Sequence, residues 1–473
     1  PNEKLQKNWK YYIEEAKQEP DVQVKLDEIK KEHAKLEPTD IKCIDPCMGS
    51  GHILCYMFDV LMQIYEIYGY DSRHAAASIV ENNLYGLDID ERASQLAYFA
   101  VMMKACQYDR RFLRRGIQPR VYAIEESNAI SSYVVDYFVN NDPKIRKMVD
   151  TLISEFHDAK EYGSILNISM LNFDELNQRA SECKEEIEIN LYQGKVEEQI
   201  VPLIHVGQIL AQKYHVVVTN PPYAGSKGLN DKLRKKIKDL YSCATGDLFT
   251  PFIVKALYLI NSIGEAGIIT PTSWLYNPRY SKYREYLINH LQIINLTELG
   301  DSAFEVGFGT SVFIFNATLQ KNYWGTYIDA KNLVQEQREF YDLRKLKQYH
   351  IKETFFADYK GCKFSYKLTD AYREILRKSK PLSTYGQARA GLQTDNNDLF
   401  IRRWYEVSKS QLNLNHKKGD MFDNRKWFPH IKGGTYRKWY GNLVSVVNWQ
   451  YDGRDIKNRA AKKYGSYTKR VQS

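Results

Sequence analysis

The sequence predicts an α/β fold, a doubly wound, mostly parallel sheet of seven strands with a helical insertion, followed by a separate basic domain. Apolar segments of strand length alternate with helical patterns between residues 41 and 316, which is typical of such sheets. Turn-forming glycines and prolines stand directly after several of these segments. The excess positive charge lies in residues 401–473.

Length and composition set the broad class. A chain of 473 residues is longer than one ordinary domain, and its 43% hydrophobic content excludes wholesale disorder. No stretch reaches the roughly 20 apolar residues that span a bilayer, and no signal-peptide pattern is present. The seven cysteines include no CxxC pair, so neither a zinc site nor a disulfide framework is indicated. We therefore expect a cytoplasmic protein without a metal site or a membrane partner.

The first elements are short and clearly bounded. Residues 1–38 are expected to form a helical N-terminal segment. A strand at 41–44 leads into a glycine loop, and apolar residues then recur at helical spacing over 52–68. A second strand at 84–87 is followed by another helix, and a third strand is expected at 120–124.

The remaining strands lie beyond a long, charged stretch at about 128–213, which we interpret as a helical insertion. The segment 214–219 (YHVVVT) resembles a buried strand. Residues 39–316 would thus form one domain, in which ligands bind at the carboxyl ends of the strands. Its last elements are expected to be helices at 247–262 and 280–290 and strands at 267–270, 293–298 and 311–315.

The end of the chain differs in charge. Residues 317–380 are charged and irregular and are expected to be a connector, and 381–473 is expected to begin a separate domain. Residues 401–473 hold 17 Lys and Arg against 5 Asp and Glu. Because basic side chains neutralise phosphates and flat rings stack on bases, a polyanion partner is favoured over a merely solvated basic surface. The interleaved aromatic residues are Trp404, Tyr405, Trp427, Phe428, Tyr436, Trp439, Tyr440, Trp449 and Tyr451.

The first candidate site is the glycine loop at residues 45–52 (DPCMGSGH). Gly49 and Gly51 permit a tight turn and a close approach of the backbone to a ligand. A dinucleotide fingerprint would need a third glycine where Leu54 stands, and no Gly-Lys-Ser/Thr of a P-loop is present. Asp45 would repel a phosphate but suits an ammonium group. A purely structural turn remains the alternative.

The second candidate is Asp88, which closes the second strand. A carboxylate there can accept hydrogen bonds from both hydroxyls of a ribose. The alternative is a helix N-cap, a role that Asp90 before Glu91 suits well. We therefore assign the ribose to Asp88 and the cap to Asp90.

The third and most specific candidate is the tetrapeptide Asn220, Pro221, Pro222 and Tyr223, directly after the strand 214–219. An aromatic amine is a poor nucleophile because its lone pair is delocalised into the ring. Acceptors at the side-chain oxygen of Asn220 and the carbonyl of Pro221 would favour a pyramidal nitrogen, and Tyr223 can stack on the base. Such a base must leave the duplex, because its amino group is otherwise paired.

The three motifs resemble those of the S-adenosylmethionine-dependent amino-methyltransferases, in particular the adenine-N6 branch. The resemblance covers about residues 41–316 and implies a Rossmann-like methyltransferase sheet. It implies S-adenosyl-L-methionine as the cofactor and N6 of a flipped adenine in double-stranded DNA as the target, the activity of a site-specific, adenine-specific DNA methyltransferase.

The resemblance also implies roles for single residues. Asn172 with Phe173 is a second candidate for reading the adenine of the cofactor, and Phe304 is expected to stack on the target base beside Tyr223. The implied cofactor residues are Asp45, Cys47, Gly49 and Gly51 at the methionine end, Asp88 at the ribose and Glu126 at the adenine.

Residues 44–54, 90–93 and 391–405 further resemble the large adenine methyltransferases of BREX phage-exclusion systems, which are similar to type II restriction–modification methyltransferases. This resemblance makes 381–473 the beginning of a DNA target-recognition domain and adds other defence-system subunits to the expected partners. The chain begins at Pro1 and is expected to be a fragment of a longer protein.

Several alternatives stay open. Cytosine-C5 chemistry would need a Pro-Cys pair downstream of the cofactor loop, whereas Pro46 and Cys47 lie inside it. A protein-glutamine methyltransferase uses the same tetrapeptide but is compact and lacks a large basic domain. RNA adenine is a further possible target. A non-catalytic DNA-binding module that retains the fold is the alternative outside the enzymes.

Overall fold

The computed structural model describes residues 3–185, 191–225, 228–301, 307–320, 322–333, 342–359, 361–386, 391–415 and 424–465. The chain forms two compact units, Pro1–Arg377 and Lys378–Ser473.

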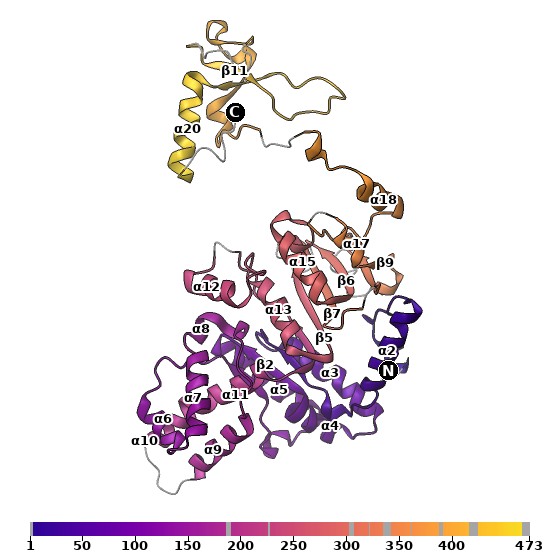
Figure 1. The fold of residues 1–473 in the computed structure, drawn as a ribbon, viewed down its shortest axis with the longest axis vertical. Coiled ribbons are helices and arrows are strands. Elements are labelled where there is room, and N and C mark those ends of the chain that lie inside the picture. Colours follow the sequence, from indigo (N-terminus) through magenta and orange to yellow (C-terminus); the bar gives the residue numbers. More distant parts are fainter. Residues whose placement is uncertain are drawn as a thin grey trace. The chain divides into compact units, whose positions relative to one another are not determined.

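The first unit is built on one mixed sheet with the strand order β3-β2-β1-β4-β5-β7-β6-β8-β9. Figure 1 labels β2, β5, β6, β7 and β9 of this sheet. β1 pairs in parallel with β2 and β4, β2 with β3, and β4 with β5. β7 is antiparallel to both β5 and β6. The α/β fold predicted from the sequence is confirmed. The strands are β1 (Cys43–Asp45), β2 (Leu84–Asp88), β3 (Arg120–Ala123), β4 (Tyr214–Thr219), β5 (Ile260–Pro271), β6 (Gln292–Gly300), β7 (Thr310–Asn316), β8 (Trp324–Asp329) and β9 (Gln348–Lys352).

The prediction of seven strands and of a connector over 317–380 was wrong. β8 pairs in parallel with β6, and β9 pairs with β8, so the same sheet continues to nine strands. The residues of β8 between its two ends are buried, but the charged segments around this short strand hide its pattern in the sequence. Residues 317–377 therefore belong to the first unit.

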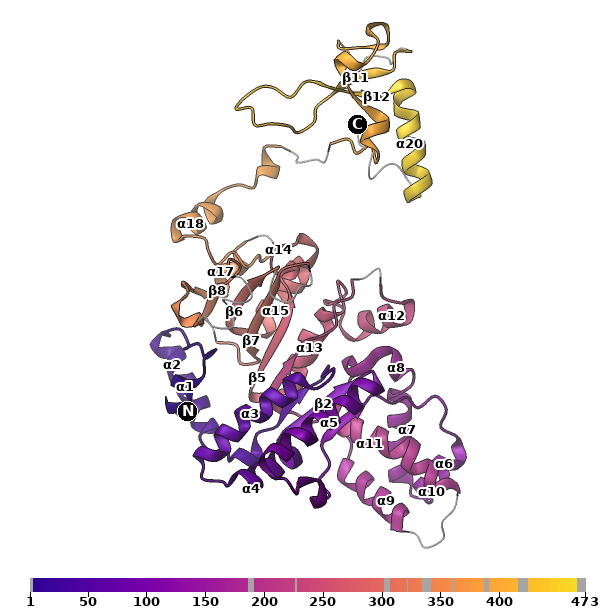
Figure 2. The same ribbon diagram turned by 180° about the vertical axis from the view of Figure 1, so that it is seen from behind.

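Helices cover both faces of the sheet. Alternate strand residues face opposite sides, so Ile44 and Tyr85 join the core with the insertion helices, whereas Cys43 and Leu84 join the core with α3, α4 and α5. The predicted insertion is helical, and α6, α7, α9, α10 and α11 gather beside the sheet (Figures 1 and 2). The helices are α1 (Glu3–Asn8), α2 (Pro20–His33), α3 (His52–Ile67), α4 (Ser72–Ser78), α5 (Glu91–Tyr108), α6 (Ser132–Val139), α7 (Pro143–Glu155), α8 (Ala159–Tyr162), α9 (Phe173–Glu185), α10 (Leu191–Lys195), α11 (Val201–Ala211), α12 (Asp231–Leu240), α13 (Phe249–Leu259), α14 (Ser273–Tyr276), α15 (Ser281–His290), α17 (Thr354–Ala357) and α18 (Asp370–Lys378).

The second unit has a small antiparallel sheet in the order β10-β12-β11. Its core joins Phe400, Phe428, Val447 and Trp449 from the sheet side to Ile456 and Ala460 of α20. The elements are α19 (Asn397–Phe400), β10 (Ile401–Arg403), β11 (Trp427–His430), β12 (Ser445–Asn448) and α20 (Gln450–Tyr464). In the described part of the chain, no helix combines the length and apolar character that crossing a membrane requires.

Candidate functional site

The glycine loop joins β1 to α3 and places its two glycines differently. Gly49 has φ +52°, and a Cβ there would meet no atom within 4 Å. Gly51 has φ +85°, and a Cβ there would lie 2.9 Å from Cα of Ala97 in α5. Gly51 therefore allows close packing of α5 against the loop, whereas Gly49 leaves the backbone open on the side where a ligand could approach.

Asp88 ties the end of β2 to this loop. Its Oδ2 accepts a hydrogen bond from the Gly49 N–H at 2.9 Å, and its Oδ1 accepts one from the Asp90 N–H at 2.9 Å. Asp90 in turn accepts the Arg92 N–H at 2.8 Å and caps α5. The predicted cap is confirmed. The ribose role of Asp88 stays a prediction, now with the added finding that its carboxylate orders the glycine loop.

Asp45 is fully buried at the end of β1. Its Oδ1 accepts the Cys47 N–H at 3.0 Å, whereas its Oδ2 has no hydrogen-bond partner among the described residues. Burial and, to a smaller extent, the nearby Asp88 carboxylate raise the pKa of Asp45 to about 7, against the lowering effects of the Cys47 N–H and the Thr219 hydroxyl. A buried carboxylate oxygen without a partner is costly and suits a cationic or hydrogen-bonding ligand group.

Ser164 is a neighbour of the loop that sequence reasoning missed. It lies in a short 3-10 turn of the insertion, Gly163–Ile165. Its Oγ donates to the carbonyl of Pro46 at 2.5 Å and lies 3.8 Å from Sγ of Cys47. The insertion therefore forms one wall of the loop, and Cys47 faces that wall.

The two candidates for reading an adenine differ in their surroundings. Glu126 lies three residues beyond β3, in a segment drawn to the end of β2 by a 2.8 Å hydrogen bond from the Ile124 N–H to the Asp88 carbonyl. Asn172 instead bonds through its side chain to Glu175 at the start of α9. Phe173 is buried in the core. Asn172 and Phe173 thus have local structural contacts, and the roles of both candidates toward an adenine stay predictions.

The loop at residues 220–223 follows β4, the strand beside β1. Thr219, the last residue of β4, is fully buried, and its Oγ1 has no hydrogen-bond partner among the described residues. Its hydroxyl lies close enough to Asp45 and Cys47 to influence the pKa of both. The two loops thus follow adjacent parallel strands and lie at the same edge of the sheet, as predicted.

Tyr223 is held by its neighbours. Its hydroxyl donates to Oδ1 of Asn220 at 2.5 Å and lies 3.2 Å from the carbonyl of Ile269. Burial raises its pKa to about 12, so the hydroxyl stays protonated. The ring meets Phe308 edge-on at 5.8 Å between centroids and Phe249 at 6.5 Å.

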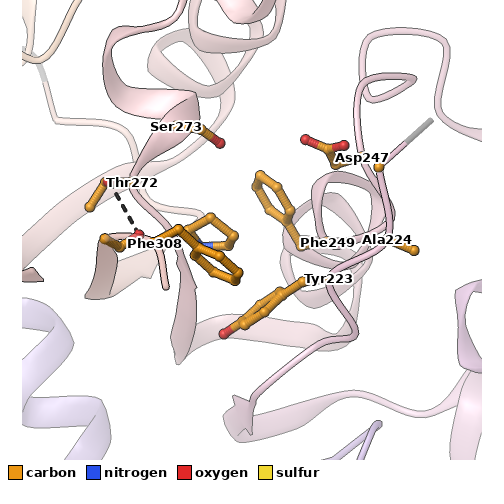
Figure 3. Close-up of a pocket in the computed structure, with 10 residues that line it drawn as sticks. Tyr223, Ala224, Asp247, Phe249, Thr272, Ser273 and Phe308 are labelled. Atoms are coloured by element: carbon orange, nitrogen blue, oxygen red, sulfur yellow. Dashed lines mark hydrogen bonds between the residues drawn. The ribbon is translucent and has the colours of Figure 1, made fainter. Parts of the chain in front are cut away.

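A pocket of about 320 Å³ opens beside this loop. Figure 3 shows Tyr223, Phe249 and Phe308 turned toward the same space. Phe308 is 38% exposed and can contact a ligand. The predicted stacking residue Phe304 lies outside the described residues. The pocket is lined by Tyr223, Ala224, Gly225, Asp247, Phe249, Pro271, Thr272, Ser273, Phe308 and Gly309.

The segment before α13 braces the pocket. The Leu248 N–H donates to the Ala224 carbonyl at 2.9 Å, next to a backbone bridge between Gly225 and Asp247. The Asp247 carboxylate accepts the Tyr280 hydroxyl. Neither Asp247 nor the aromatic pair of Phe249 and Phe308 was predicted, because their part in the pocket depends on segments that meet through the fold.

Comparison with known proteins finds relatives among methyltransferases. Residues 82–304 match the Eco57I restriction-modification methylase family. The adenine-specific methyltransferase PglX of Lacticaseibacillus casei (strain Zhang) is 34% identical over 97% of this chain and 39% of that protein. The adenine-specific methyltransferase BrxX of Escherichia coli O9:H4 (strain HS) is 33% identical over 98% of this chain and 40% of that protein.

A more distant match is the type II methyltransferase M.BstVI of Geobacillus stearothermophilus, 27% identical over 31% of this chain and 29% of that protein. The chain spans about two fifths of the length of the first two relatives. As the resemblance in its motifs predicted, the chain is thus similar over nearly its whole length to the adenine-specific methyltransferases PglX and BrxX, with an Eco57I restriction-modification methylase match at its centre.

Proposed function

We propose that this chain carries the catalytic core of a methyltransferase that moves a methyl group from S-adenosyl-L-methionine to N6 of an adenine flipped out of double-stranded DNA. The observation that carries the proposal is the adjacency of the two loops. The glycine loop and the loop 220–223 leave neighbouring parallel strands, and Thr219 lies beside Asp45 between them. Donor and acceptor can therefore meet at one edge of the sheet.

The residues of the second loop suit a planar amino group. Oδ1 of Asn220 is exposed enough to accept a second hydrogen bond beside that of Tyr223. With the carbonyl of Pro221, it would hold both hydrogens of the amine and turn the nitrogen lone pair away from the ring. The rings of Tyr223 and Phe308 offer a stacking surface for the base, and the proton released can pass to solvent.

The glycine loop fits the cofactor. Within the described part of the chain, Asp45 has a buried oxygen without a hydrogen-bond partner, which suits the ammonium of the methionine part, and the open side of Gly49 admits a close ligand. Asp88 would hold the ribose and Glu126 the adenine, while Cys47 lines the pocket and Gly51 shapes its turn. When bound, the cofactor supplies an electrophilic sulfonium methyl group.

The basic second unit would begin the part that recognises DNA, and the whole would act in a phage-defence or restriction–modification system, as the names of the relatives suggest. Other subunits of such a system are further candidate partners. The excess of basic over acidic residues in 401–473 supports DNA as the partner.

The test is mass spectrometry of nucleosides after incubation of the full-length protein with labelled cofactor and DNA. N6-methyladenine in duplex DNA, absent with Asn220→Ala, is the expected result. Methylation of RNA or of a protein glutamine instead would replace the proposed substrate. Cofactor binding without any transfer, in the presence of the partner subunits, would leave a non-catalytic DNA-binding module.

A further inference from the structure

We propose that residues 431–444 of the second unit form an aromatic arm that contacts the bases of duplex DNA with its rings and the flanking phosphates with its cations. This inference rests on the proposed function in taking DNA as the partner. It goes beyond it in naming the element that makes the contact and the chemistry it uses. Figure 2 shows the arm as the long loop between β11 and β12.

The rings of the aromatic arm face solvent. Tyr436 and Trp439 are each 88% exposed, and Tyr440 is 83% exposed. Each large ring left in water costs free energy that burial against a partner would recover. Three such rings within five residues are a local concentration of exposed aromatic surface, and exposed apolar surface of this kind is typical of interaction sites.

Charge selects the kind of partner. The aromatic arm has the sequence IKGGTYRKWYGNLV, with the cations Lys432, Arg437 and Lys438 and no carboxylate. Nζ of Lys438 lies 5.5 Å from the centre of the Trp439 ring. A segment that combines cations and flat rings and has no carboxylate suits a partner with many negative charges and flat aromatic groups. A nucleic acid has both, in its phosphates and its bases. A protein partner of ordinary composition would give the cations no matching density of negative charge.

The tip of the arm has a defined shape. Nδ2 of Asn442 donates to the carbonyl of Thr435 at 3.1 Å, which closes the turn that carries the rings. A Cβ at Gly441 would lie 2.6 Å from Cγ of Arg437, so the glycine makes room for the stem of that side chain. A preorganised turn loses less conformational entropy when its rings bind.

The scaffold of the arm is a packed sheet. The arm connects β11 to β12, which pair directly from Trp427–Asn448 to His430–Ser445. Phe428 and Val447 of these strands are buried in the core of the unit. Both ends of the arm are therefore anchored on a rigid sheet, while its exposed rings project from that sheet. An element that contacts a groove or the base steps of duplex DNA needs such an arrangement.

The experiment measures duplex binding by the full-length protein with fluorescence anisotropy, at several salt concentrations. Trp439→Ala should weaken binding about tenfold, and the triple variant Tyr436→Ala, Trp439→Ala and Tyr440→Ala should weaken it further. Trp439→Phe should stay near wild type because it keeps a flat ring. Arg437→Ala with Lys438→Ala should lower the slope of log affinity against log salt by about one to two, whereas the ring variants should leave that slope unchanged.

A matched control is Tyr133→Ala, which removes a ring that is 70% exposed on α6 of the first unit. It should bind DNA like wild type. Because the rings of the arm are exposed, their variants should melt at the wild-type temperature, which circular dichroism checks. Wild-type affinity of the triple variant would overturn the proposal, and so would equal losses in Trp439→Phe and Trp439→Ala, because the ring would then not be the contact.

The result also separates this inference from the proposed function. Methylation by the wild type together with normal DNA binding by the triple variant refutes the arm alone. Loss of binding in the triple variant, with no methylation by any form, refutes the proposed function and leaves the arm standing.

Discussion

The pocket beside Tyr223 and the aromatic arm use the same kind of side chain in opposite ways. In the pocket, Phe249 is 1% exposed, and the hydroxyl of Tyr223 is fixed by Asn220 and Ile269. On the arm, Tyr436 and Trp439 are 88% exposed. On the proposed function, the rings that place one base are held in position before the base binds. On the proposal for the arm, rings that contact an extended DNA surface stay exposed to solvent until they bind.

The difference has an energetic consequence. A substitution in the pocket changes both the fold and the site, because the replaced side chain has protein neighbours. A substitution on the arm changes binding alone.

Asn220→Ala should lower methyl transfer by about 10²- to 10³-fold or more, because it removes the proposed acceptor for the amine. Cofactor affinity should stay within a few-fold, since the proposed role of the residue is to hold the base and not the cofactor. Single-turnover transfer to duplex DNA and calorimetry with the cofactor measure the two quantities. The matched control is Asn289→Ala, which removes an amide bonded to its own helix α15. Retained transfer by Asn220→Ala would contradict the assigned role.

Asp88→Ala should weaken cofactor binding by about 10- to 100-fold, the effect of losing a charged acceptor. Two causes add, because the carboxylate would hold the ribose and already accepts the N–H groups of Gly49 and Asp90. Calorimetry measures the affinity. Asp90→Ala serves as the comparison, since it removes the cap of α5 and should lower the melting temperature with a smaller effect on affinity. Equal affinity losses in the two variants would show that loop order, not ribose contact, is what Asp88 provides.

Asp45 should make cofactor binding depend on pH. Its pKa is raised to about 7, so the carboxylate gains its charge as the pH rises from about 6 to about 7.5, and affinity for a cationic group should rise several-fold over that range. In the protein without cofactor, the stability of the fold changes with pH in the opposite direction. The raised pKa favours the protonated folded form, so stability falls as the pH rises from about 4 through 7.

Asp45→Asn should flatten both pH profiles, measured by calorimetry with the cofactor and by thermal melting without it. A cofactor affinity of the wild type that is constant from pH 6 to 7.5 would show that Asp45 does not face a cationic group.

Local patterns predicted the elements that carry the motifs. The strand over 214–219 was predicted at its observed bounds, because an apolar segment runs directly into prolines. The glycine loop and the cap at Asp90 were also predicted from the sequence, since each depends on neighbours within a few residues.

Contacts between segments that are distant in the chain could not be predicted from the sequence. Ser164 forms a hydrogen bond with Pro46, which lies 118 positions away in the chain. No sequence pattern around either residue predicts that contact. Phe249 and Phe308 come from different segments and meet at Tyr223 through the sheet. β8 and β9 were missed because both strands are short and lie among charged residues, so that their sequence resembles a connector.

Tyr223→Phe should have the smallest effect and sharpens the contrast between pocket and arm. The ring and its stacking surface stay, but Oδ1 of Asn220 loses the hydrogen bond from the tyrosine hydroxyl at 2.5 Å. The amide should then be less well oriented, so that kcat falls about three- to tenfold while cofactor affinity is unchanged, and the unfolding free energy falls by about 1 kcal/mol. Steady-state kinetics and denaturant unfolding measure both. Trp439→Phe, the matched ring exchange on the arm, should change neither quantity, because its ring has few protein neighbours to lose. If Tyr223→Phe keeps wild-type kcat and stability, the hydroxyl does not position Asn220, and the protein contacts of Tyr223 do not prepare the pocket for a base.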